Sequence, residues 1–242
     1  MSARSRTLGI GIAVAIVAAI AVVAWYITRD AVAEVDIDSA AGASAAPSAA
    51  PAIADLADLA GEWTVTNTGG DDLESGTFVG YRVEEELAQV GATTAVGRTS
   101  AVDGTMTIGD DATVSDVTIS ADVTQLRSDQ SFRDRAIQDQ GLETAQFPEA
   151  GFSLDEPVTI PEEALGGATV TIPATGTLTL HGVDQQVTVD LEARLVGEQI
   201  VAGGAIPIAM ADYDITPPSA QRVLSIDEEG IAELQVFFAR AS

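Results

Sequence analysis

The sequence predicts an all-β fold: an antiparallel β-barrel with one short helix, preceded by a single N-terminal transmembrane helix. Three observations predict it. Apolar and polar residues alternate over long stretches, Gly- and Asp-rich turn signals separate these stretches, and an uncharged apolar segment stands near the N-terminus. The expected strands reach about ten residues, longer than the usual 5–6, and long twisted strands tend to close into a barrel.

The apolar segment runs from Leu8 to Ile27 without a charge. As a helix it would be about 30 Å long, the thickness of the hydrocarbon layer of a bilayer. Arg4 and Arg6 precede it and acidic residues follow it, so the positive-inside rule places the rest of the chain outside the cytoplasmic membrane. We predict residues 1–29 as a cytoplasmic stub and a single-pass anchor. The alternative is a secreted protein, cleaved near Ala33 after a signal peptide.

Residues 30–60 are rich in Ala, Ser and Pro and hold too few large apolar side chains to form a core. Such a composition is typical of a linker. A short helix near Ile53–Leu59 is an open alternative within it. The folded domain is predicted to span residues 61–242.

The clearest alternation extends from Ala168 to Ile208 and predicts three long strands of one sheet, with a tight turn at His181–Asp184 after the first of them. The same pattern predicts strands around Tyr81, around Ile119 and around Val236. In each strand one face is apolar and the other polar, as expected for the wall of a barrel.

The polar segment Ser128–Gly141 breaks this pattern. Ser128 and Asp129 are N-cap candidates and Gly141 a stop signal, so the segment is predicted to be the short helix. Its charges admit two interpretations. Either Arg133 and Asp134, with Arg127 and Asp129, form weak ion pairs on a solvated helix, or the helix is a lid whose arginine faces a polar head group.

Composition narrows the classes of partner. The 242 residues carry a net charge of −26, with no lysine and no cysteine. The acidic excess predicts no nucleic-acid partner, and the missing cysteines exclude thiol chemistry. His181, the only histidine, is assigned a turn-stabilising role, with contact to a ligand as the alternative. The acidic runs 84–86, 110–111 and 227–229 lack calcium-loop spacing and are predicted to be solvated. We therefore expect no metal, no cofactor and no catalytic residue.

Four motifs follow one another along the domain: Ser75–Val83, then Val96–Thr99 with Val102–Gly104, then Ser128-Asp129 and Arg133-Asp134 before Phe147-Pro148, and last Gly176–Val183. Across most of residues 61–241 the chain resembles the YceI-like family of polyisoprenoid-binding proteins. The resemblance implies a lipocalin-like barrel with an apolar tunnel for an isoprenoid or another amphiphile, which the protein would sequester without catalysis.

The inward face is rich in small and β-branched residues, which is compatible with a ligand-filled cavity or with a flattened, solid core. For the ligand-filled alternative, the predicted binding residues are Val79, Tyr81, Val83, Val117, Ile119, Phe152, Leu178, Leu180, Val189 and Leu191, with Arg133 facing the head group. The alternative function is a cell-envelope interaction module with a solidly packed barrel. A homodimer is also left open, and a hydrolase is the least supported class because no catalytic constellation appears.

Overall fold

The computed structural model describes residues 34–44, 55–69, 73–88, 90–219 and 223–241. The chain divides into two units, Met1–Ala33 and Glu34–Ser242. The predicted cytoplasmic stub, the anchor over Leu8–Ile27 and the cleavage site near Ala33 lie outside the described residues. Among the described helices, none combines the length and the apolar character needed to cross a membrane.

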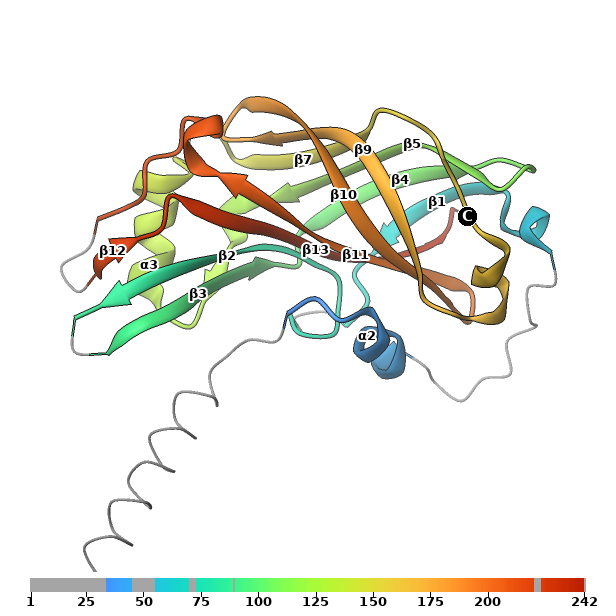
Figure 1. Cartoon of the computed structure of the whole chain (residues 1–242), viewed down its shortest axis with the longest axis horizontal. Coiled ribbons are helices and arrows are strands. Elements are labelled where there is room, and N and C mark those ends of the chain that lie inside the picture. The colour runs from blue at the N-terminus through green and yellow to red at the C-terminus, as the bar shows by residue number, and fades with distance from the viewer. Residues whose placement is uncertain (1–33, 45–54, 70–72, 89, 220–222, 242) are drawn as a thin grey trace, which may run out of the picture. The chain divides into compact units, whose positions relative to one another are not determined.

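Within the described residues, eight antiparallel strands close a barrel in the order β1-β4-β5-β7-β9-β10-β11-β13, with β13 pairing back to β1 (Figure 1). The prediction of an all-β antiparallel barrel is therefore confirmed. The strands are β1 (Gly61–Thr66), β4 (Val102–Ile108), β5 (Thr113–Asp122), β7 (Glu149–Leu154), β9 (Val170–Leu180), β10 (Val183–Val196), β11 (Gln199–Ala209) and β13 (Glu229–Arg240).

The last strand, β13, organises the sheet. One of its edges pairs with β11. The other pairs with β2 along Ile231–Gln235 and with β1 along Phe237–Arg240. The remaining strands extend or fill in this framework: β2 (Phe78–Leu87), β3 (Gly91–Thr99), β6 (Arg127–Ser128), β8 (Val158–Thr159) and β12 (Val223–Ile226).

The described connections between the strands contain one short α-helix and several single helical turns. The predicted helix over 128–141 is present as α3 (Ser131–Ala136), which continues into a π-helical turn, η3 (Ile137–Gly141). The 3₁₀ turns are η1 (Leu56–Leu59), η2 (Val123–Gln125), η4 (Glu162–Gly166) and η5 (Met210–Tyr213). We refer to the end of the barrel where α3, η3 and η5 lie as the α3 end.

The turn between β9 and β10 consists of His181 and Gly182, both with positive φ (54° and 73°). A two-residue turn with positive φ at both positions is the type I′ hairpin, whose twist matches that of the strands it joins. Leu180 consequently pairs with Val183 and the apolar faces of both strands stay in phase. A side chain at Gly182 would collide with the Phe147 ring, 2.6 Å from the added carbon.

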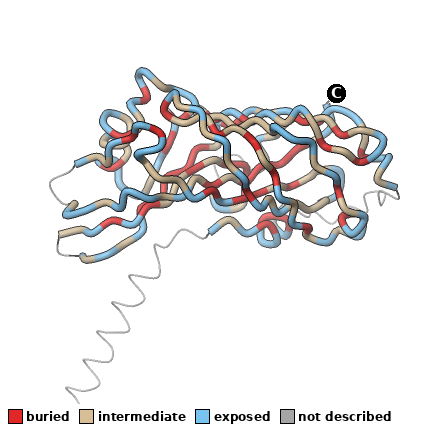
Figure 2. Tube along the Cα trace, turned by 45° about the horizontal axis from the view of Figure 1, so that its top comes forward, coloured by how far each residue is buried: buried red, intermediate tan, exposed pale blue. Residues whose placement is uncertain are grey.

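An additional helix, α2 (Ile37–Ser44), packs on the outside of the barrel. Its apolar residues Ile37, Ala40 and Ala41 follow helical spacing and are almost fully buried against Val201 of β11 and Phe237 of β13. Buried positions therefore occur on α2 as well as along the barrel strands (Figure 2). Residues 34–44, which the sequence analysis placed in the linker, belong to the barrel unit.

Candidate functional site

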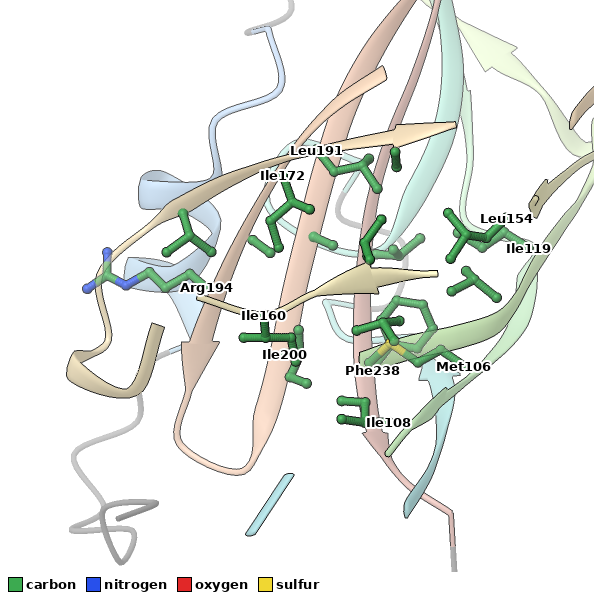
Figure 3. A pocket seen from close by; sticks show the side chains of 18 of the residues that line it. Met106, Ile108, Ile119, Leu154, Ile160, Ile172, Leu191, Arg194, Ile200 and Phe238 are labelled. Atoms are coloured by element: carbon green, nitrogen blue, oxygen red, sulfur yellow. The ribbon is translucent and has the colours of Figure 1, made fainter. Parts of the chain in front are cut away.

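The barrel encloses a cavity of about 120 Å³. Its walls are apolar side chains from seven of the eight barrel strands, from β8 and from the turns η1 and η4 (Figure 3). Ile119 and Phe152 line one side, and Leu191, Ile200 and Phe238 line others.

Small residues on the inward face create this space. Ala193 and Ala202 are paired across β10 and β11, and both line the cavity. Val117, Ile172 and Leu195 also point into it and are only half-buried. Because an ordinary protein core leaves few voids larger than a water molecule, accessible apolar surface at inward positions indicates room for a guest.

The α3 end of the barrel is filled instead. Leu178 and Ile206 of the strands pack there against Tyr213 of η5 and Ile215 beyond it, and all four are buried. The two interpretations of the inward face thus apply to different parts of one barrel: a cavity in one part and a packed core at the α3 end.

The predicted binding residues divide between these regions. Val117, Ile119, Phe152, Val189 and Leu191 line the cavity. Leu178 and Leu180 belong to the packed α3 end, and Val79 packs beside the core cluster that contains Ile119. Tyr81, Val83 and Arg133 do not line this cavity. The ligand-binding role of all of them stays a prediction.

Sequence reasoning named five of the 25 described residues that line the cavity and missed the rest. Met106 and Ile108 lie on β4, a strand that was not anticipated. Ile200 and Ala202 continue the alternation that predicted β11, so that pattern alone could have included them.

Arg133 is buried, with 8 % of its surface exposed. Its Nη2 lies 2.5 Å from Oε1 of Glu85, itself 5 % exposed, and its Nη1 donates to Asp129. Burial alone would lower the pKa of Arg133, but the hydrogen bond and charge of Glu85, supported by Asp129, raise it above its usual value. In the described part of the chain its Nε finds no partner. The solvated-helix interpretation is therefore wrong for Arg133.

The acidic run 84–86, which was predicted to be solvated, is only partly so. Glu84 and Glu86 are exposed as predicted, but Glu85 is buried because alternation turns it to the inner face of β2, where it meets Arg133 of α3. Nearby Tyr81 is largely buried, and this burial raises the pKa of its phenol despite the opposing charge of Arg133.

A second buried ionic cluster lies on the opposite face of β2. Oε1 of Glu233 accepts from Nε of Arg98 at 2.6 Å, and Oε2 accepts from Nε of Arg82 at 2.7 Å. The Arg98 guanidinium also stacks 3.9 Å from the centre of the Phe78 ring and donates to the Leu73 carbonyl. This cluster supports the sheet and does not reach the cavity.

Among the described residues that line the cavity, Arg194 alone is charged, and its side chain points away from the cavity (Figure 3). Its Nη1 binds Asp38 of α2 at 3.0 Å. In the ranges that the structure covers, no group of three or more His, Asp or Glu side chains is arranged to hold a metal ion. The site is thus an apolar cavity whose described lining presents no charge to a guest.

The fold and the cavity together define an antiparallel β-barrel protein with an apolar interior. The chain matches the model of the YceI-like domain over residues 74–236 and belongs to the YceI-like family.

Three solved structures share the fold. A polyisoprenoid-binding domain from Saccharophagus degradans, implicated in plant cell wall breakdown, superposes with a TM-score of 0.53 and 16 % identity, covering 74 % of this chain and 98 % of that one. BcnA of Burkholderia cenocepacia gives 0.51 and 14 %, covering 66 % and 95 %. The Campylobacter jejuni YceI protein gives 0.50 and 14 %, covering 60 % and 85 %. A comparison with curated proteins finds no match.

Proposed function

We propose that the barrel binds and sequesters a lipid-like molecule, an isoprenoid or another amphiphile, in its apolar cavity and does so without catalysis. We further propose that the domain works outside the cytoplasmic membrane, anchored by residues 8–27 or secreted after cleavage near Ala33. The apolar cavity is the observation that carries the binding proposal. The S. degradans relative, described as a polyisoprenoid-binding domain, supports the ligand class.

The energetics suit an apolar chain. Burying each methylene of a ligand contributes about 0.8 kcal/mol, so tight binding needs no charged contact. The cavity of about 120 Å³ is close to the roughly 150 Å³ engineered cavity that holds one benzene molecule. The cavity therefore accommodates a short apolar group in its present form. A longer chain would fit only if the cavity extended further along the barrel.

The direct test is native mass spectrometry of the protein purified from its own membranes. A co-purifying lipid that leaves under denaturing conditions supports the proposal. A bare mass, with no uptake of geraniol by the delipidated protein, would favour the packed interaction module, which the filled α3 end supports.

Filling the cavity should separate binding from stability. In Ala202→Phe the ring would occupy ligand volume, so we expect stability within about 1 kcal/mol of wild type and at least a tenfold loss of affinity for geraniol, measured by calorimetric titration. The matched control is Ala121→Phe, because Ala121 is 1 % exposed and does not line the cavity. That control should lose about 1–3 kcal/mol through overpacking and keep its affinity per folded molecule. If Ala202→Phe and Ala121→Phe were equally destabilised, and the purified wild-type protein carried no lipid, the proposed binding of a ligand in the cavity would be contradicted.

The location has its own test. Protease added to intact spheroplasts should degrade the domain or release it from the membrane, because the positive-inside rule, applied to the charges around Leu8–Ile27, predicts that it lies outside. Survival of the domain until the cells are lysed would refute this orientation. A soluble form beginning at Glu34 would select the secreted alternative.

A further inference from the structure

Two segments that belong to no barrel strand close the α3 end, and Figure 1 shows both at that end. One continues from α3 and η3 to Phe147, and the other is residues 210–219, which follow β11 and contain η5. They also contact each other: the Ser219 amide donates to Gln140, and Pro218 lies beside Gly141.

The second segment puts side chains inside the barrel. Tyr213 (2 % exposed) and Ile215 (9 %) pack among the inward residues Leu178, Val189 and Ile206. Val189 and Ile206 also line the cavity. Tyr213 and Ile215 therefore fill the space into which the cavity would otherwise continue, and we call residues 210–215 the plug.

His181 joins the two segments. Its Nδ1 lies 3.0 Å from the Tyr213 carbonyl oxygen, in the plug, and its Nε2 lies 3.1 Å from Oε2 of Glu143, in the first segment. The Phe147 ring packs edge-on against the imidazole, with 4.4 Å between ring centres. The imidazole is thus held between both segments that close the barrel.

Both hydrogen-bond partners of His181 are acceptors. A carbonyl oxygen and an ionised carboxylate can only accept, whereas a neutral imidazole has one N–H to donate. The arrangement is therefore complete only when both ring nitrogens carry protons. The charged residues next to these contacts in the sequence are acidic: Glu143 itself, Asp212 and Asp214 that flank Tyr213, and Asp184 at the start of β10, which accepts from Thr179. The basic residues of the first segment, Arg133 and Arg135, lie in α3.

Three residues at this junction have a left-handed backbone conformation. Glu143 (φ 44°), His181 (φ 54°) and Asp214 (φ 54°) occupy the left-handed region. They are three of the five non-glycine residues that do so in the ranges covered by the structure. At His181 the conformation belongs to the type I′ turn, and at Asp214 it ends η5.

We propose that the plug is a gate controlled by the protonation of His181. The protonated imidazole holds Tyr213 and Glu143 together and keeps the α3 end closed. Loss of the proton removes one of the two hydrogen bonds, so the plug leaves the barrel more readily and the cavity extends to admit a long apolar chain. This inference rests on the proposed function, because it concerns access to the same cavity.

The test compares two uncharged probes, geraniol as the short chain and geranylgeraniol as the long one. Affinities are measured at about pH 5 and pH 8, the range over which histidine side chains change charge. The long probe should bind about tenfold more tightly at the higher pH, the factor expected for one charge-assisted hydrogen bond. The short probe should bind equally at both pH values.

His181→Asn is the diagnostic variant, because asparagine tolerates a positive φ and cannot gain the charge. His181→Asn should bind the long probe equally at both pH values. If His181→Asn does not fold, Glu143→Gln is tested in its place, with the same expected result. Since His181 is the only histidine, nitrogen NMR of its ring reports its protonation directly and should show both nitrogens protonated in the closed form.

Two results would overturn the gate: a pH effect that persists in His181→Asn, or equal pH effects on both probes. If neither probe binds at any pH, the proposed function fails, while the NMR experiment still shows whether the imidazole is doubly protonated.

Discussion

Replacing Glu233 with glutamine is expected to lower the free energy of unfolding by about 3–5 kcal/mol, the usual cost of removing one partner of a buried ion pair. Glu233 is 2 % exposed, and its two carboxylate oxygens serve Arg98 and Arg82 separately. Glutamine keeps the shape but removes the charge, so both guanidinium groups would lose the carboxylate of Glu233 in a poorly solvated position. Urea unfolding followed by circular dichroism measures the loss.

Glu84→Gln is the matched control. Glu84 lies on the neighbouring strand β2, is exposed, and its carboxylate accepts a hydrogen bond from the Thr94 hydroxyl at 2.6 Å. Its replacement should change stability by less than about 0.5 kcal/mol, as is usual at the surface. Similar losses in the two variants would mean that the buried cluster contributes nothing specific to the sheet.

Ile37→Ala is expected to cost about 2–5 kcal/mol, the range for truncating a fully buried isoleucine. Ile37 is 0 % exposed and packs against Val201 and Phe237, which are themselves fully buried beneath α2. Thermal or urea unfolding of the purified protein measures the effect. A passive linker would tolerate the same change without a measurable loss.

Asp38→Asn provides the comparison within the same helix. The side chain of Asp38 is 70 % exposed and pairs with the partly exposed Arg194, and such surface pairs contribute about 0–1 kcal/mol. If Ile37→Ala costs no more than this control, α2 does not stabilise the barrel and the linker interpretation regains support.

Much of the barrel could be predicted because its strands carry their own signal. In β9 and β10 nearly every second residue is apolar, and the turn residues His181 and Gly182 interrupt the pattern where the chain reverses. In contrast, β3 includes Gly91–Ala95, a run of small and hydroxylated side chains without clear alternation. Its pairing with β2, from Leu87 opposite Gly91 to Val79 opposite Thr99, defines it as a strand, and this pairing leaves little trace in the alternation of β3 itself.

For the site, the sequence predicted the inward-facing residues but not their tertiary contacts. Alternation shows which residues face inward, and Val117 and Leu191, selected on that basis, line the cavity. It does not show which inward positions are covered by other segments. Leu178 faces inward too, but Tyr213 and Ile215 pack on it from a connection whose path depends on long-range contacts. The partners of Glu85 and Glu233 are likewise set by the tertiary fold.

The position of β13 has a consequence for how the chain reaches its native state. This strand, the last one described, pairs with β11, β2 and β1, so the barrel cannot close until residues 229–240 have been synthesised. Closure also joins Trp63 to Arg240 across nearly the whole domain, and pairing over such sequence distances makes folding slow. A growing chain would therefore leave its apolar strands unpaired until the final strand is in place, and it would need protection from aggregation during that time.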